Sequence, residues 1–155
     1  MVVSGEKIKL RNNVVKSKEV GEDGKVKTNK KMSSVVSIIV DGSSVETCGD
    51  TVIFQETGLT PDVLFDSTDI ESHAKGIGDN TSVAGIVNKY KNIFGKSRVV
   101  IIKSQLGVPI MAYSGKSVYY EICDDLPKTT KVMIDDRALY IHQSNFQLVD
   151  KDLLD

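Results

Sequence analysis

The stretch from residue 98 to residue 148 consists of short β-prone runs separated by turn residues, and this pattern constrains the fold more than any other feature. The runs are rich in Val, Ile, Tyr and Phe, which favour strands. Gly, Asp, Asn or Pro lies between several of them, as expected for turns. The runs read RVVIIKS, VPIMAY, SVYYEI, KVMI, ALYIH and FQLV. We therefore expect an antiparallel sheet built from successive hairpins.

A second group of predicted strands precedes this stretch. Residues 34–40 are strongly β-prone, Asp41-Gly42 is a two-residue hairpin signal, and residues 43–47 and 51–56 can follow as partner strands. We expect these three strands to be adjacent and antiparallel. Residues 1–31 are polar and rich in lysine, which predicts an exposed β region at a sheet edge, where lysine discourages aggregation between sheets.

One amphipathic helix is predicted between the two groups, over residues 81–94. Its apolar residues recur at helical spacing, and Gly95 ends it. The preceding residues 57–80 are acidic, contain Gly and Pro, and show no period, which predicts a long loop. A helix with one apolar face has to cover a sheet. The expected fold class is therefore α+β: one domain, residues 1–155, with an antiparallel or barrel-like sheet and the helix packed on it.

Composition and charge exclude some classes of protein. Hydrophobic residues make up 40% and charged residues 26% of the chain, as in ordinary globular proteins, and the longest apolar runs are too short to cross a bilayer. The net charge of −1 argues against a dedicated nucleic-acid binder. Charge is nevertheless segregated, because residues 80–118 carry six basic residues and no acidic residue. Either oppositely charged segments lie near each other in the fold, or this basic block meets an anionic partner.

Neither a cofactor site nor a metal site is predicted. The two Gly-Lys-Ser fragments, at Lys96 and Lys116, lack the upstream glycine of a phosphate loop and precede strands, where a phosphate loop precedes a helix. The only histidines and cysteines do not have the paired spacing of structural zinc sites; they are His73, His142, Cys48 and Cys123. For the cysteines, free buried thiols are the default expectation, with a long-range disulfide or a reactive thiol as alternatives.

Two groups of residues are candidates for a functional surface. Tyr119 and Tyr120 are adjacent in a predicted strand and must point to opposite faces, so at least one is exposed. With nearby cations they form a predicted interaction surface, which consists of Tyr119, Tyr120, Lys103, Lys116 and Arg98. The competing hypothesis is a hydrolase that uses His142 as a general base together with Asp135 or Asp136.

Several phrases of strand and turn residues resemble a known family. They are Cys48-Gly49-Asp50-Thr51-Val52-Ile53-Phe54 with Thr57-Gly58-Leu59, Ser104-Gln105-Leu106-Gly107-Val108-Pro109-Ile110, Asp124-Asp125-Leu126-Pro127-Lys128 and Ala138-Leu139-Tyr140-Ile141-His142. From about residue 34 onward the chain resembles an uncharacterised family of Firmicutes proteins catalogued as a domain of unknown function. The resemblance implies a lipoprotein with a secretion signal. Met1-Val2-Val3-Ser4 is not such a signal, so either the sequence starts after it or this member is cytosolic.

Taken together, these patterns predict a non-enzymatic binding or structural module without a cofactor. The resemblance makes it the exported domain of a cell-surface lipoprotein, whose partner is another protein or an envelope component. A hydrolase is one alternative. The other is a weak binder of anions or nucleic acid through the basic 80–118 block, with Lys89, Lys96, Arg98, Lys103 and Lys116 as its contact residues.

Overall fold

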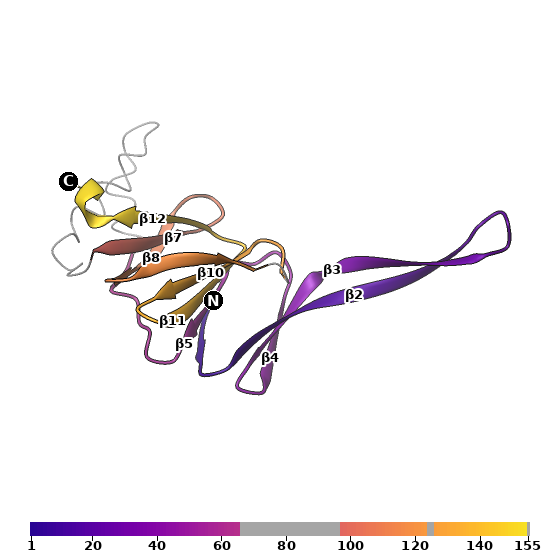
Figure 1. The fold of residues 1–155 in the computed structure, drawn as a ribbon, viewed down its shortest axis with the longest axis horizontal. Helices are drawn as coiled ribbons and strands as arrows, with labels where there is room; N and C mark the ends of the chain where they lie inside the picture. Colours follow the sequence, from indigo (N-terminus) through magenta and orange to yellow (C-terminus); the bar gives the residue numbers. More distant parts are fainter. Residues whose placement is uncertain (66–96, 124–125, 155) are drawn as a thin grey trace.

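The computed structural model describes residues 1–65, 97–123 and 126–154, and this part of the chain is almost entirely β structure (Figure 1). Its only helical segment is a four-residue 3-10 helix, η1 (Lys151–Leu154). The strands are β1 (Val2–Gly5), β2 (Ile8–Val20), β3 (Val26–Val40), β4 (Ser43–Thr47), β5 (Val52–Glu56), β6 (Val63–Leu64), β7 (Arg98–Lys103), β8 (Pro109–Gly115), β9 (Val118–Ile122), β10 (Thr129–Ile134), β11 (Arg137–His142) and β12 (Asn145–Asp150).

The expected α+β fold class is wrong, because the described residues are nearly all in β-sheets and contain no helix of seven residues or more. The expected helix, residues 81–94, lies outside the described residues, as does the expected acidic loop beyond Phe65. We expected an apolar helix face to cover the sheet. Among the described residues, the apolar faces of the sheets pack against one another instead, which satisfies the same physical requirement.

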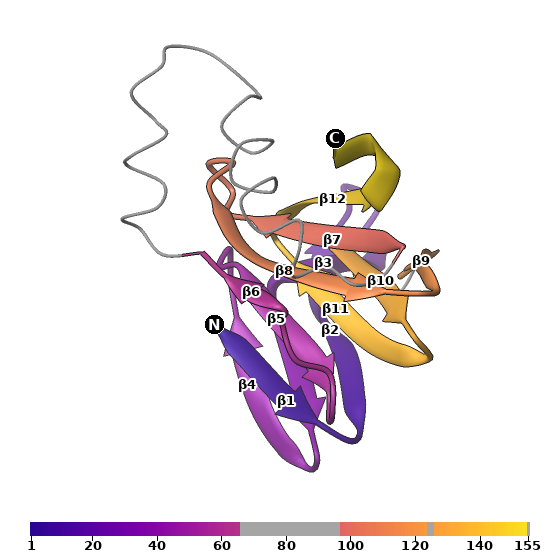
Figure 2. The same ribbon diagram turned by 90° about the vertical axis from the view of Figure 1, so that its left-hand side faces the viewer.

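The strands form three sheets (Figure 2). Their orders are β1-β5-β11-β10-β9 in the five-stranded sheet, β12-β7-β8-β6 in the four-stranded sheet and β2-β3-β4 in the three-stranded sheet. Every described pairing is antiparallel except the parallel pair of β1 and β5, so the expected antiparallel sheet structure is largely confirmed. The expectation that the first strand group forms one sheet is wrong, because β5 leaves β3 and β4 and pairs with β11 and β1.

The five-stranded sheet is the middle layer of the body. On one face, Ile53 and Leu139 pack with Val100 and Tyr113 of the four-stranded sheet. On the other face, Phe54 packs with residues of β3. Adjacent residues of a strand point to opposite faces, so a strand buried on both sides reads as a continuous apolar run. This explains why residues 52–55 of β5 are all buried.

Tight hairpins connect several neighbouring strands. Asp41 and Gly42 join β3 to β4 and have φ values of 50° and 89°, and Asp135 and Asp136 join β10 to β11 with φ values of 45° and 67°. Positive φ at both central residues matches the right-handed twist of the strands. Asp and Gly adopt this conformation more easily than other residues, which is why both turns were predictable from sequence.

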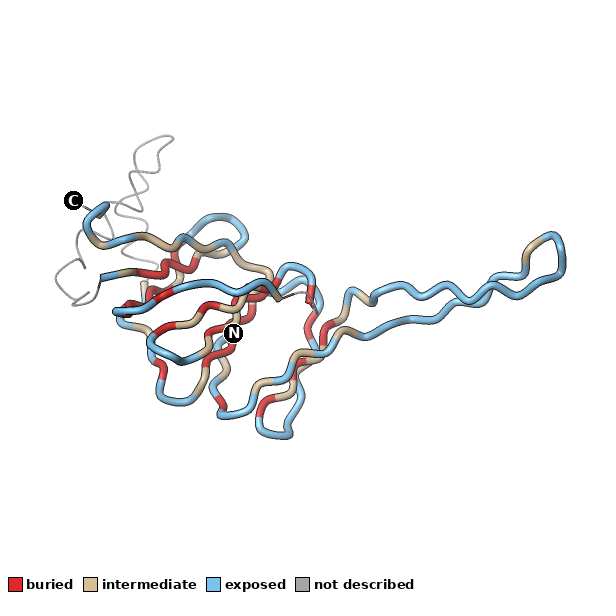
Figure 3. The backbone as a smooth tube through the Cα atoms, viewed as in Figure 1, coloured by how far each residue is buried: buried red, intermediate tan, exposed pale blue. Residues whose placement is uncertain are grey.

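The hairpin of β2 and β3 leaves the body and projects as a long arm (Figure 1). Near the body, β3 alternates buried and half-buried residues, with Val36, Ile38 and Val40 in the core. Beyond residue 33 toward the hairpin turn this alternation ends. Every residue from 13 to 32 except Gly21 is exposed (Figure 3). We call residues 13–32 the arm. The strands leave the body where the sequence stops supplying a core face.

Candidate functional site

A groove lies between the five-stranded and four-stranded sheets, beside an edge strand of each sheet that has no further pairing partner among the described residues. These edge strands are β9 and β12. The groove has a volume of about 400 Å³. Its described lining is mainly apolar and consists of Arg98, Tyr120, Glu121, Ile122, Cys123, Thr129, Thr130, Phe146 and Leu148. An apolar groove beside an unpaired strand edge has the features of a site that accepts an extended polypeptide as an added strand.

Tyr119 and Tyr120 lie on opposite faces of β9, as the sequence predicts. Tyr120 is opposite Val132, a core residue, and lines the groove with 63% of its surface exposed. Ile122, on the same face, is 81% exposed. Tyr119 is on the other face of the sheet, near the ion pair of Lys131 and Glu121. Tyr120 therefore belongs to the groove and Tyr119 does not.

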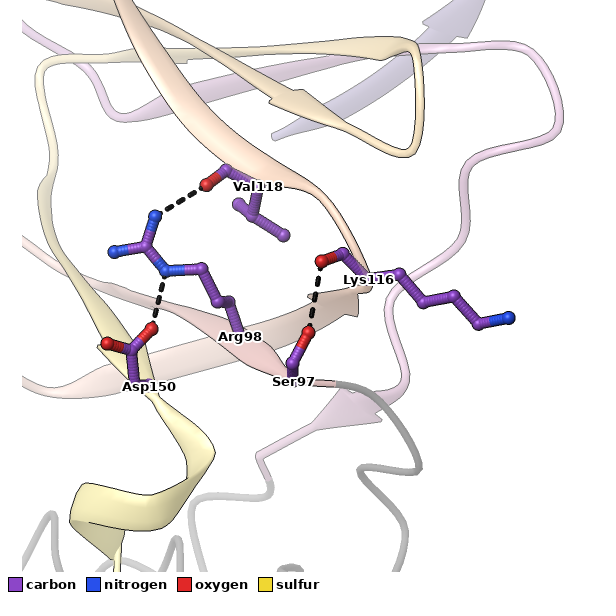
Figure 4. A network of polar contacts seen from close by, with 5 residues as sticks. All are labelled: Ser97, Arg98, Lys116, Val118 and Asp150. Carbon is purple, nitrogen blue, oxygen red and sulfur yellow. Dashed lines mark hydrogen bonds and ion pairs between the residues drawn. The ribbon is translucent and has the colours of Figure 1, made fainter.

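Arg98 fastens the two sheets at one end of the groove (Figure 4). Its Nε atom lies 2.7 Å from Oδ1 of Asp150 on β12, and its Nη1 donates a hydrogen bond of 2.8 Å to the carbonyl oxygen of Val118 on β9. Beside it, Ser97 Oγ donates a hydrogen bond to the carbonyl of Lys116. The guanidinium group is thus engaged in joining three strands that are far apart in the sequence.

The other two predicted cations lie away from the groove lining. Lys103 is at the opposite end of β7 from Arg98, and burial lowers the pKa of its ammonium group. Lys116 is exposed in the turn between β8 and β9, and its side chain points away from Arg98 (Figure 4). Of the predicted interaction surface, the structure brings together Arg98 and Tyr120.

The residues of the hydrolase hypothesis lie at opposite ends of one hairpin. His142 ends β11, whereas Asp135 and Asp136 form the turn before it, about 20 Å away at the usual rise of a strand. His142 is buried, its Nδ1 lies 2.7 Å from Oγ1 of Thr129, and burial, followed by the charge of Lys128, lowers its pKa. Asp135 accepts backbone hydrogen bonds from the β8–β9 turn. The structure gives each residue a local role and does not bring them together.

A second cavity, of about 550 Å³, lies near His142 but is lined differently. Its described lining contains no carboxylate and consists of Gln105, Lys128, Thr129, Thr130, Ile141, Gln143, Ser144 and Asn145. Across residues 1–65, 97–123 and 126–154, no group of three or more His, Cys, Asp or Glu side chains could hold a metal ion. The described lining of this second cavity therefore offers no carboxylate that could act with His142.

The structure forms no disulfide between Cys48 and Cys123. Cys48 is exposed, so the expectation of a buried thiol is wrong for this residue, whereas Cys123 is half-buried at the groove. Of the basic block proposed as an anion-binding surface, Lys89 and Lys96 lie outside the described residues. Arg98, in the same block, is already paired with Asp150.

The arm is the exposed feature that sequence reasoning missed. Residues 1–31 were expected to form an edge region, but β2 and β3 run on as a hairpin that extends beyond the body. A signal for this was present. Two consecutive β-prone segments around the Gly21–Gly24 turn lack the alternating apolar residues that would give either of them a core face.

Within the described residues, no helix is long and apolar enough to cross a membrane. Neither a curated protein nor a solved structure was found to match the chain. Residues 1–154 match the family described as Domain of unknown function (DUF5052). This match confirms the resemblance to a family of unknown function, and the chain belongs to the DUF5052 family.

Proposed function

We propose that this protein is a non-catalytic binding module that contacts a component of the cell envelope through its arm. The observation that carries the proposal is the projection of residues 13–32 away from the body with both faces exposed (Figures 1 and 3). An isolated two-stranded hairpin is marginally stable in water. A hairpin that extends away from a packed body is therefore stabilised when a partner binds and covers it.

The exposed side chains of the arm support a contact role. Five large hydrophobic residues on it are more than half exposed: Val14, Val15, Val20, Val26 and Met32. Single exposed apolar residues are common on protein surfaces. Here, however, five occur on one ribbon that has no core of its own. The cross-strand pairs of Val14 with Met32 and Val20 with Val26 support the ribbon, and all five side chains remain open to a partner.

Export is proposed on the family resemblance. The resemblance implies a lipoprotein of Firmicutes held at the cell surface, and an arm that reaches out from an anchored body suits recognition of nearby envelope material. The separation of His142 from Asp135 and Asp136 supports the non-catalytic part of the proposal. The groove beside Tyr120 is a second contact region under the same proposal.

The test compares the full chain with a variant in which residues 13–35, the arm and the three residues after it, are replaced by a two-residue Asn-Gly turn between Asn12 and Val36. The remaining pairs of β2 and β3 next to the body stay in register, because Ile8 faces Val40 and Asn12 faces Val36. Thermal unfolding first checks that the body of the variant is intact. Both proteins are then sedimented with isolated envelopes, wall and membrane together, from a Gram-positive bacterium.

We expect the full chain to co-sediment and the shortened variant to stay in solution. Equal co-sedimentation of both proteins would show that the arm is not the contact element. If neither protein co-sediments, the proposed envelope contact is wrong. A matched variant, Tyr120→Ser with Ile122→Ser, keeps the arm and measures the contribution of the groove separately.

A further inference from the structure

The two faces of the arm differ in charge. The register of β2 and β3 beyond the irregularity at Asn12 and Val14 is regular, so residues two apart and directly opposite share a face. One face, which we call the lysine face, consists of Val14, Lys16, Lys18, Val20, Val26, Thr28, Lys30 and Met32. It carries three ammonium groups and no carboxylate.

The carboxylate on the arm strands lies on the opposite face. Glu19 is opposite Lys27, and its Oε2 accepts a hydrogen bond of 2.8 Å from Nδ2 of Asn29. In the turn, Asp23 lies 3.9 Å from Nζ of Lys25. Neither Glu19 nor Asp23 therefore neutralises a cation of the lysine face. The three ammonium groups of the lysine face have no ion pair within the described residues.

This arrangement costs stability. Lys16 and Lys30 lie directly opposite each other, and like charges at such positions destabilise a ribbon. Lys18 is two residues farther along on the same face, roughly 7 Å away. Protection against aggregation explains lysines on an exposed ribbon, but it would be served equally well on either face. It does not explain why three cations are clustered on one face and the carboxylate is excluded from it.

We propose that the lysine face binds a linear, phosphate-bearing polymer. This inference rests on the proposed function of the arm and names the chemistry of its ligand. A lysine ammonium is a compact point charge that suits phosphate oxygens, and the described arm contains no arginine, the residue suited to bidentate carboxylate recognition. A chain of phosphates supplies successive negative charges along the ribbon, where Lys16 lies directly opposite Lys30 and Lys18 follows two residues farther along the same face.

A polymer fits this site better than a flat anionic membrane. The turn of the arm is its farthest point from the body (Figure 1), and this turn carries Glu22 and Asp23. A bilayer approached by the tip would first meet these acidic residues, which anionic headgroups repel. The lysines lie midway along the ribbon, where a linear chain can reach them from the side.

The experiment measures binding of the full chain to fluorescently labelled long-chain inorganic polyphosphate by anisotropy, over a series of salt concentrations. The test variant is Lys16→Gln, Lys18→Gln and Lys30→Gln together. The matched control is Lys25→Gln, Lys27→Gln and Lys31→Gln, which removes the same charge from the same arm but leaves the lysine face intact. Vesicles of phosphatidylglycerol and phosphatidylcholine serve as a second probe.

Three phosphate contacts predict a slope of about −2 for log K against log salt, so binding weakens roughly tenfold or more between 50 and 200 mM salt. We expect the test variant to lose this slope, and the control to keep most of it. Equal loss in both variants would reduce the effect to net charge and overturn the proposal. Binding to vesicles without binding to polyphosphate would also overturn it, in favour of a membrane. If the shortened arm abolishes envelope binding while the test variant keeps it, the arm proposal stands and the phosphate proposal fails.

Discussion

Arg98 offers the sharpest test of how the body is held together at the groove. Replacing it with Met removes two contacts and keeps much of the aliphatic side chain. The ion pair with Asp150 is partly exposed, with side-chain exposures of 37% and 57%, so it contributes only about 0.5 kcal/mol. The charged hydrogen bond to the Val118 carbonyl is part-buried and contributes about 1.5 kcal/mol. We expect Arg98→Met to lower the free energy of unfolding by about 2 kcal/mol.

Asp150→Asn provides the matched comparison, because it removes the ion pair and leaves the bond to Val118 in place. We expect it to lower the free energy of unfolding by about 0.5 kcal/mol. Urea unfolding measures both, and an unchanged dependence on urea concentration would show that the effect is on stability alone. In thermal unfolding, Arg98→Met should lower Tm by roughly 4–8 °C. Equal destabilisation by the two variants would mean that the bond from Arg98 to Val118 contributes nothing, and the reasoning would be refuted.

Two further predictions concern the residues of the hydrolase hypothesis. Burial, and then the charge of Lys128, lower the pKa of His142 below its usual 6.5, so the unfolded chain binds more protons in mildly acidic solution. The contribution of the neutral, buried His142 to stability is complete above about pH 6.5 and is lost as the pH falls below that value. A His142→Gln variant should therefore lose less stability than the native protein between about pH 7 and pH 5. Parallel pH profiles of the two proteins would contradict this. The side chain of Asp135 accepts two backbone hydrogen bonds, and its backbone has a positive φ. Asp135→Ala should therefore lower the free energy of unfolding in urea by about 1–2 kcal/mol, whereas Asp135→Asn, which keeps an acceptor and tolerates this φ, should lower it less. Equal effects of the two variants would exclude this role of Asp135 in the turn.

Local structure followed closely from the sequence. The predicted hairpin of RVVIIKS and VPIMAY is the pair β7 and β8, and KVMI with ALYIH is the pair β10 and β11. Alternation and turn residues act over a few positions, so they could be recognised without knowing what the strands pack against. The family assignment was also within reach, because it depends on the residue order alone.

The grouping of strands into sheets could not be predicted in this way. β5 follows β4 after a short turn, yet it pairs with β11 and β1, so that Phe54 faces one core and Ile53 the other. The sequence shows that Val52, Ile53 and Phe54 are apolar, but not which layers cover them. The expected fold class was wrong because we assigned the helix predicted at residues 81–94 to cover the sheet. Apolar residues show that a face has to be covered but not which element covers it, and in the described residues the sheets cover one another.

The residues of the candidate surfaces also come together through strand pairing that the sequence does not reveal. The groove joins Arg98, Tyr120 and Phe146, which come from three strands and have no local pattern that links them. The lysines of the arm were visible in the sequence, but their shared face depends on the pairing of β2 with β3, which places Lys16 opposite Lys30. The sequence alone determined strands, turns and the absence of a core face in the arm, since these depend on neighbouring residues. Tertiary structure decided which strands pair and which side chains meet, because long-range burial selects among many pairings that local preferences leave equally favourable.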